Sequence, residues 1–280
     1  MSSPTSQPRA PALLLHAGLV PLALVWLAPL WLMLTYSTVS DEEFYTPGAV
    51  LVPGSHFAGN LQALLEKTPF MSALLNSLGI AVVTTVLNVA LSCMAGYALA
   101  RFRLPEARVL FGSVIAMLTV PYIVVAVPQF VMVSRVFHLT NTWTGVVLPT
   151  LCNAMSVYYM RQNFLRLPQE LLDCARVDGV GEVKIFICIA VPLVLPALAT
   201  LTIISFLQAW NDYLWPLLIL STPESWTAPV ALGSLVGSLD RVMWGAIMAG
   251  TLLMTAPMIC VFLLLQRYIV SGIAAVGRGA

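Results

Sequence analysis

The residues best suited to chemistry gather in one stretch, Arg161–Phe186, which holds eight of the chain's 25 formal charges (13 basic and 12 acidic). Pro168 is typical of a helix start and Gly179 of a helix end. We therefore expect a short amphipathic helix of about two to three turns outside the bilayer. Its apolar side would be formed by Leu171, Leu172, Ala175 and Val177. Such a helix could rest on lipid headgroups or in a groove of a cytoplasmic partner.

A second set of candidates consists of uncharged polar residues within apolar stretches. Such groups can join helices by hydrogen bonds, or they can line a path for a hydroxyl-rich solute. Thr84, Thr85, Asn88 and Ser92 belong to this set. The candidate solute-path residues are Asn76, Gln129, Asn153, Gln208 and Asn211.

Other kinds of site are not indicated by the residues present. The five Cys are scattered without a CxxC pair and the three His are isolated, so we expect neither a metal site nor a disulfide framework. The sequence contains no GxxxxGK[ST] phosphate-binding loop, no nucleophile–base pair and no carboxylate dyad. We therefore expect a protein that is not an enzyme and binds no cofactor, and whose energy for any pumping comes from a partner.

The composition defines the class of protein that must position these residues. Hydrophobic residues make up 59% of the 280 and charged residues only 9%, against about 25% charged in soluble domains. This excludes a soluble enzyme and a disordered chain. A net charge of +1 without a basic stripe also excludes a nucleic-acid partner. The sequence predicts an integral protein of the lipid bilayer.

Six stretches without Asp, Glu, Lys or Arg are long enough to cross a bilayer as helices. They are Ala10–Ser40, Thr68–Ala100, Val109–Ser134, Val136–Met160, Ile185–Asn211 and Val242–Gln266. The fold class expected is all-α, polytopic, with six transmembrane helices, because a β-barrel needs short alternating segments. The remaining apolar pieces within 213–239 are expected to form an interfacial or re-entrant loop rather than a seventh span.

These spans give a division of the chain. Residues 1–11 would form a cytoplasmic tail, 12–38 the first transmembrane helix and 39–68 an external loop. Residues 69–280 would form a core of five transmembrane helices that carries the charged loop 166–186. Basic residues favour the cytoplasmic side by ten to three, with both termini cytoplasmic. Those ten are Arg9, Arg101, Arg103, Arg108, Arg161, Arg166, Arg176, Lys184, Arg267 and Arg278.

Prolines interrupt two of the expected spans. Pro121 and Pro128 lie in the third, and Pro192 and Pro196 in the fifth. Each leaves a helix carbonyl without its usual donor. Fixed kinks and hinges beside a solute cavity both remain possible at these positions.

The stretch Pro168–Leu198 resembles the EAA motif of binding-protein-dependent ABC import permeases, which reads approximately EAA-x3-G-x9-I-x-LP. Asp173, Cys174 and Ala175 match the EAA positions, and Gly179 matches the glycine. The closing I-x-LP is matched by Ile189, Val191 and Pro192. The departures are Asp for Glu, Cys for the first Ala and Val for Leu.

Other segments resemble the carbohydrate-importer branch of that family, over roughly Gly48 to the C-terminus. These are GYALA with Arg101, LTNTWTGVVLP, FLQAWNDYLWPL and QRYIVSGIAAV. LVPGSHFAGNLQALL resembles the corresponding loop of sugar and glycerol-3-phosphate permeases.

The resemblance implies that the charged loop is a coupling helix that fits a groove on a cytoplasmic ATPase. Its pairing residues would be Glu170, Asp173, Arg176 and Asp178, and its groove-filling residues Leu172, Ala175 and Val177. The partners implied are a second, homologous permease, an ABC ATPase dimer and an extracytoplasmic substrate-binding protein, at the bacterial inner membrane. The solute implied is a sugar, an oligosaccharide or a polyol phosphate such as glycerol-3-phosphate. An ion-coupled secondary carrier is the alternative, disfavoured by the charge-free spans.

Overall fold

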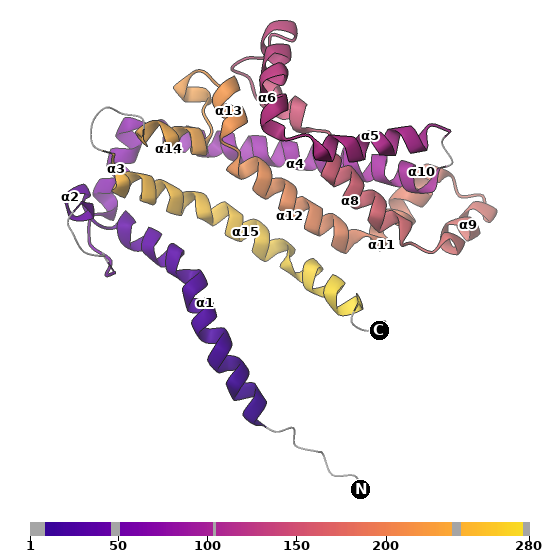
Figure 1. The fold of residues 1–280 in the computed structure, drawn as a ribbon, viewed down its shortest axis with the longest axis horizontal. Coiled ribbons are helices and arrows are strands. Elements are labelled where there is room, and N and C mark those ends of the chain that lie inside the picture. Colours follow the sequence, from indigo (N-terminus) through magenta and orange to yellow (C-terminus); the bar gives the residue numbers. More distant parts are fainter. Residues whose placement is uncertain (1–8, 46–50, 103–104, 237–241, 277–280) are drawn as a thin grey trace. The chain divides into compact units, whose positions relative to one another are not determined.

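The computed structural model describes residues 9–45, 51–102, 105–236 and 242–276, and every regular element within these ranges is helical (Figure 1). The chain forms two compact units. The first comprises residues 1–68 with 234–253, and the second comprises 69–233 with 254–280. The all-α class expected from the sequence is confirmed for the described residues.

Three helices are long and apolar enough to cross a membrane as single rods. They are α1 (Arg9–Ser37), α4 (Phe70–Arg101) and α15 (Trp244–Val276). They fall on the first, second and sixth predicted stretches. Of the predicted tail, residues 1–8 lie outside the described residues, and α1 already begins at Arg9.

Two further predicted spans are bent helix pairs. In the third stretch, α5 (Ala107–Thr119) meets α6 (Tyr122–Val131) and the π-helix Met132–Val136 at 104°. In the fifth, α10 (Glu182–Ile185), the π-helix Phe186–Ala190 and α11 (Val191–Leu193) meet α12 (Leu195–Asn211) at 80°. By length and composition, the described residues supply three crossings, or up to five if each bent pair is one.

Proline accounts for both bends. Val120 precedes Pro121 and is extended, with φ −86° and ψ 119°, because a residue before proline avoids the helical region. At the second bend Val194 leaves helical geometry, with φ −102° and ψ 14°. Pro196 then lies in the first turn of α12, where its missing N–H costs nothing.

The single helix expected over Val136–Met160 is wrong. The chain instead forms α7 (Trp143–Val147), the 3₁₀ turn Leu148–Thr150 and α8 (Ala154–Leu165). The physical reason is capping: the side chains of Thr142 and Asn153 accept hydrogen bonds from backbone N–H groups and start new helices. Hydropathy does not register these caps, since the apolar character is continuous across them.

Both segments expected to be loops contain helices. The external segment 39–68 holds α2 (Asp41–Phe44) and α3 (Phe57–Lys67). The segment 213–239 holds α13 (Leu214–Ile219), the 3₁₀ turn Pro223–Ser225 and α14 (Ala228–Val236), while residues 237–239 lie outside the described residues. Each of these helices is too short to cross a bilayer alone.

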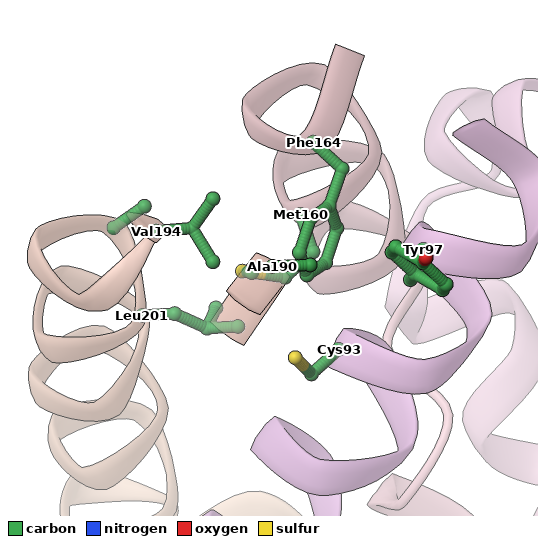
Figure 2. Packing of buried hydrophobic residues seen from close by; sticks show 8 residues of the cluster. Cys93, Tyr97, Met160, Phe164, Ala190, Val194 and Leu201 are labelled. Carbon is green, nitrogen blue, oxygen red and sulfur yellow. The ribbon is translucent and has the colours of Figure 1, made fainter. Parts of the chain in front are cut away.

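The core of the second unit forms where α4, α8 and α12 pack together. Figure 2 shows Tyr97 of α4 near Phe164 and Met160 of α8, with Leu201 of α12 in the same buried cluster. Gly96 permits the close approach of α4 and α8, because a Cβ atom there would lie 2.7 Å from that of Met160. This packing fixes the C-terminal end of α4 beside the charged loop.

A buried polar network joins the same three helices. Asn88 of α4 donates to the hydroxyls of Ser156 at 3.2 Å and Ser205 at 3.0 Å, and its carbonyl oxygen accepts from Ser92 at 3.1 Å. For Asn88 and Ser92 the structure therefore shows interhelical and intrahelical hydrogen bonding, one of the two roles considered for the polar residues.

Candidate functional site

The short helix predicted in the charged loop is present as α9 (Gln169–Val177), between Pro168 and Gly179. Gly179 has a φ of +77°, which favours glycine because other L-residues pay a steric cost there. The N–H of Val180 donates to the carbonyl of Ala175, and that of Gly179 to the carbonyl of Arg176, each at 3.0 Å. This pair of bonds is a Schellman motif, which ends the helix and turns the chain back along it.

The apolar side of α9 is covered by its own chain. Leu172 is completely buried and Ala175 nearly so, in a cluster with Ile185 of α10. These two residues, expected to fill a partner's groove, are thus covered by α10 of the same chain, which the turn at Gly179 brings over them. Val177, in contrast, is 88% exposed, and Leu171 is 49% exposed.

Arg176 forms two ion pairs, one within α9 and one that joins α9 to α10. Its guanidinium lies 2.6 Å from Asp173 Oδ1 and 2.6 Å from Glu182 Oε1. These hydrogen bonds hold the pKa values of Asp173 and Glu182 below their ordinary range and raise the pKa of Arg176. Asp173 and Arg176, expected to pair with an ATPase, thus already pair within the chain.

The outward side of α9 carries a shallow hollow of about 420 Å³, lined by Glu170, Asp173, Cys174, Val177 and Asp178. We call these five residues the acidic face of α9. Three carboxylates surround the exposed Val177 there, and Glu170 and Asp178 are themselves exposed. The acidic face can receive an apolar cleft bordered by basic side chains.

Arg101 is a residue whose role sequence reasoning missed. As the last residue of α4, it donates to the carbonyl oxygens of Phe164 and Leu167, the latter at 2.6 Å, and to Gln169 Oε1 at 2.7 Å. It therefore fastens the end of α8 and the start of α9 to α4. The signal in the sequence is the basic residue that directly follows the GYALA segment.

A second candidate site is a cavity of about 440 Å³ among α4, α6, α12 and the turns around α7 and α13. We call it the polar cavity. Its polar lining residues are Thr84, Asn88, Tyr122, Thr150, Asn153, Ser205, Gln208 and Asp212. It offers hydroxyls, amides and a carboxyl within one unit of the fold.

The structure places two of the five candidate solute-path residues in this cavity. Asn153 and Gln208 line it. The Asn153 side chain also caps α8. Asn211 does not line the cavity, and its amide donates to the carbonyl of Leu207 within the same helix at 2.9 Å.

The other two candidates make structural contacts. Asn76 donates to the carbonyls of Glu224 at 2.9 Å and Trp226 at 3.1 Å, which ties α4 to the turn before α14. Gln129 donates to the carbonyl of Pro149 at 3.5 Å. Neither residue lines the polar cavity.

Asp212 is the second residue missed at the sequence level. It follows α12 and lines the polar cavity, and its Oδ1 accepts a hydrogen bond from the N–H of Trp215 at 3.4 Å. Burial raises its pKa, opposed by the backbone N–H groups of Trp215 and Leu214. Asp212 follows directly after the charge-free stretch Ile185–Asn211, and charge patterning alone does not indicate that its side chain lines a cavity.

Among the described residues there is no group of three or more His, Cys, Asp or Glu side chains arranged to hold a metal ion. The polar cavity provides groups for hydrogen bonding. The acidic face provides exposed carboxylates around an exposed apolar side chain.

Residues 88–275, more than half of the chain, match the family described as binding-protein-dependent transport system inner membrane component. The match includes α9 and most of the polar cavity. The chain therefore belongs to this family, and it is a multi-pass membrane permease, a transport component rather than an enzyme. The resemblance of this chain to binding-protein-dependent import permeases is confirmed.

Individual relatives agree with this class. The chain is 34% identical to the sn-glycerol-3-phosphate transport system permease protein UgpE of Pectobacterium atrosepticum, over 92% of this chain and 94% of the relative. It is 35% identical to the trehalose transport system permease protein SugB of Mycobacterium tuberculosis, over 93% of each chain.

A solved structure has the same fold. A chain of a bacterial ABC transporter involved in the import of the acidic polysaccharide alginate superposes with a TM-score of 0.79. The superposition covers 95% of this chain and 99% of that chain, at 22% sequence identity.

Proposed function

We propose that this chain is one of two permease subunits of an ATP-driven importer for a sugar, an oligosaccharide or a polyol phosphate. The observation that carries the proposal is the family match across residues 88–275, in which the EAA-like segment folds as an exposed helix. The names of the relatives, which include a trehalose and a glycerol-3-phosphate permease, support a polyhydroxylated solute.

The acidic face of α9 is the proposed contact with the ATPase dimer. Val177 is an apolar side chain that the chain itself leaves uncovered, and Glu170 and Asp178 flank it without an ion pair among the described contacts. A partner with an apolar cleft and basic borders would bury Val177 and neutralise the carboxylates. Energy therefore enters from a separate subunit, and this chain binds no cofactor of its own.

Arg101 and Arg176 are the proposed transmission residues. Arg101 ties α9 to α4, and Arg176 ties it to Glu182 of α10. A displacement of α9 would thereby be transmitted to both α4 and α10. Pro192 lies at the far end of this connection, in α11, directly before the bend at Val194.

The polar cavity is the proposed part of the solute path contributed by this chain, with Asn153 and Gln208 among its hydrogen-bonding groups. The homologous second permease would complete the path, and an extracytoplasmic binding protein would deliver the solute. The proposed topology has six crossings in the bacterial inner membrane, with both termini cytoplasmic. The fourth crossing would consist of α7, the 3₁₀ turn and α8 in series.

The test is reconstitution of the complete importer in proteoliposomes, with the second permease, the ATPase and the binding protein. Uptake of radiolabelled trehalose and sn-glycerol-3-phosphate is measured with ATP or with a non-hydrolysable analogue enclosed. We expect uptake of at least one solute that needs hydrolysable ATP and survives a protonophore. Uptake that proceeds without ATP and collapses with the protonophore would identify an ion-coupled carrier instead.

A further inference from the structure

The polar cavity lacks a basic side chain, although relatives of this chain are named as permeases for the anion sn-glycerol-3-phosphate. Its lining residues include hydroxyls, amides and the carboxyl of Asp212, but no Lys, Arg or His. Proteins bind phosphate esters and carboxylates chiefly through Arg or Lys, or through unoccupied backbone N–H groups at helix N-termini.

Two of the helix N-termini at this cavity are already occupied by side chains of the same protein. The Asn153 carboxamide oxygen accepts from the N–H groups of Met155 at 2.9 Å and Ser156 at 3.2 Å, at the start of α8. The Asp212 carboxylate accepts from the N–H of Trp215, at the start of α13. The backbone donors at the starts of α8 and α13 are therefore used internally, whereas α6, whose first residue Tyr122 lines the cavity, has no side-chain cap.

The same lining suits an uncharged polyhydroxylated solute. Hydroxyl groups donate and accept hydrogen bonds, as do the side chains of Thr84, Thr150 and Gln208 in this cavity. The Asp212 carboxyl accepts from solute hydroxyls when ionised and can also donate when protonated, and in neither form does it carry the positive charge that pairs with an anion. A volume of about 440 Å³ lies within the range typical of small-molecule sites.

From this lining we infer that the polar cavity takes an uncharged sugar or polyol and rejects phosphate esters and sugar acids. Asp212 is the residue that sets this discrimination, because it places a carboxyl where an anion-transporting site would need a cation. The inference rests on the proposed function and narrows its solute class. It groups this chain's solute with trehalose rather than with sn-glycerol-3-phosphate.

The experiment compares three forms of the complete importer in proteoliposomes: wild type, Asp212→Asn and Asp212→Lys. The charge-matched control is Glu66→Lys, which makes the same change at an exposed side chain of α3 that contacts Gln62. The uncharged probes are trehalose, glycerol and arabinotriose, and the anionic probe is sn-glycerol-3-phosphate. ATP-dependent uptake is measured for each probe, together with basal ATP hydrolysis.

Binding of the same probes is also measured by equilibrium dialysis of the importer without its binding protein. This arm separates the permease's own preference from the choice made by the binding protein.

We expect wild-type uptake of an uncharged probe, with sn-glycerol-3-phosphate at least about tenfold slower. Asp212→Lys should slow the uncharged probe by about tenfold or more and increase retention of sn-glycerol-3-phosphate in dialysis. Asp212→Asn, which removes the negative charge but keeps hydrogen-bonding groups, should increase retention of sn-glycerol-3-phosphate in dialysis relative to wild type. Glu66→Lys should behave as wild type.

Two results would overturn the inference while leaving the proposed importer in place. One is ATP-dependent uptake of sn-glycerol-3-phosphate at a rate equal to or above that of the uncharged probes. The other is unchanged transport and binding of every probe in both Asp212 variants. A loss of uptake in Asp212→Lys through misfolding is recognised by loss of basal ATP hydrolysis. In that case dialysis of Asp212→Asn decides, because retention of sn-glycerol-3-phosphate equal to that of wild type would overturn the inference. Absence of ATP-dependent uptake for every probe contradicts the proposed function itself.

Discussion

The guanidinium of Arg101, the last residue of α4, donates a 2.7 Å hydrogen bond to the carboxamide oxygen of Gln169, the first residue of α9. The Gln169 amide donates in turn to Asp173 at 3.1 Å, and Asp173 pairs with Arg176. Because Arg176 also pairs with Glu182, an unbroken series of polar contacts runs from the end of α4 through α9 to α10.

Arg101→Lys should impair energy coupling while keeping the positive charge. A lysine ammonium is a compact donor and cannot reproduce the planar fork that reaches Leu167, Gln169 and the carbonyl of Phe164 together. We expect solute-stimulated ATP hydrolysis of the reconstituted importer to fall by about tenfold. Arg166→Lys, at an exposed position of the same loop, is the control, and equal effects of the two substitutions would contradict the role given to Arg101.

Gly179→Ala should destabilise the end of α9 by about 1–2 kcal/mol, the cost of a left-handed conformation for an L-residue. A Cβ atom at Gly179 meets nothing within 4 Å, so the cost is conformational rather than steric. Gly181→Ala is the matched control, because its φ is −67° and its surroundings are also open. Limited proteolysis of the loop should accelerate in the first variant only.

The bulkier Gly179→Asp should abolish transport while the protein still reaches the membrane.

Val177→Asp and Leu172→Ala should separate docking from folding. Val177 is 88% exposed and Leu172 is fully buried. Val177→Asp should leave thermal stability unchanged and reduce co-purification of the ATPase. Leu172→Ala should cost about 2–5 kcal/mol of stability through the cavity it leaves. Normal ATPase association by Val177→Asp would exclude the acidic face as the contact.

The carboxyls of Asp173 and Glu182 should titrate below their ordinary values of 3.8 and 4.5. Hydrogen bonds from Arg176 lower both pKa values. The pairing therefore stabilises the folded protein fully at pH values above the ordinary pKa values of the two carboxyls. That stabilisation is lost as the pH falls through the lowered pKa values of the folded protein. NMR titration of ¹³C-labelled carboxyls should show both midpoints rising in Arg176→Gln, and unchanged midpoints would show that the pairs do not form.

The sequence allowed good prediction where local rules decide the structure. Pro168 and Gly179 mark the ends of α9 because proline and glycine constrain the backbone whatever the tertiary context. Charge-free length likewise located α1, α4 and α15, since the bilayer demands it. Pro121 indicated a break in the third stretch, which the structure shows as the bend between α5 and α6.

Prediction failed where the outcome depends on what lies opposite a residue. Leu172 and Val177 are equally apolar in the sequence, and only the fold shows that α10 covers the first and leaves the second exposed. Asn76 and Gln208 are both amides in apolar stretches, yet one binds backbone carbonyls and the other lines the polar cavity. Asp212 could not be predicted, because a charged residue marks the end of an expected transmembrane stretch and this criterion says nothing about which side chains line a cavity.

The contact of α9 with α10 also gives this part of the second unit the geometry of a lever. The arm from Glu182 to Leu193 is about 18 Å long at about 1.5 Å per residue, and it ends at the 80° bend before α12. Because Arg176 and Leu172 fix α9 to the base of this arm, a push on α9 would swing the arm about Val194. A small linear movement of α9 would thus be converted into an angular movement of the segment from Glu182 to Leu193.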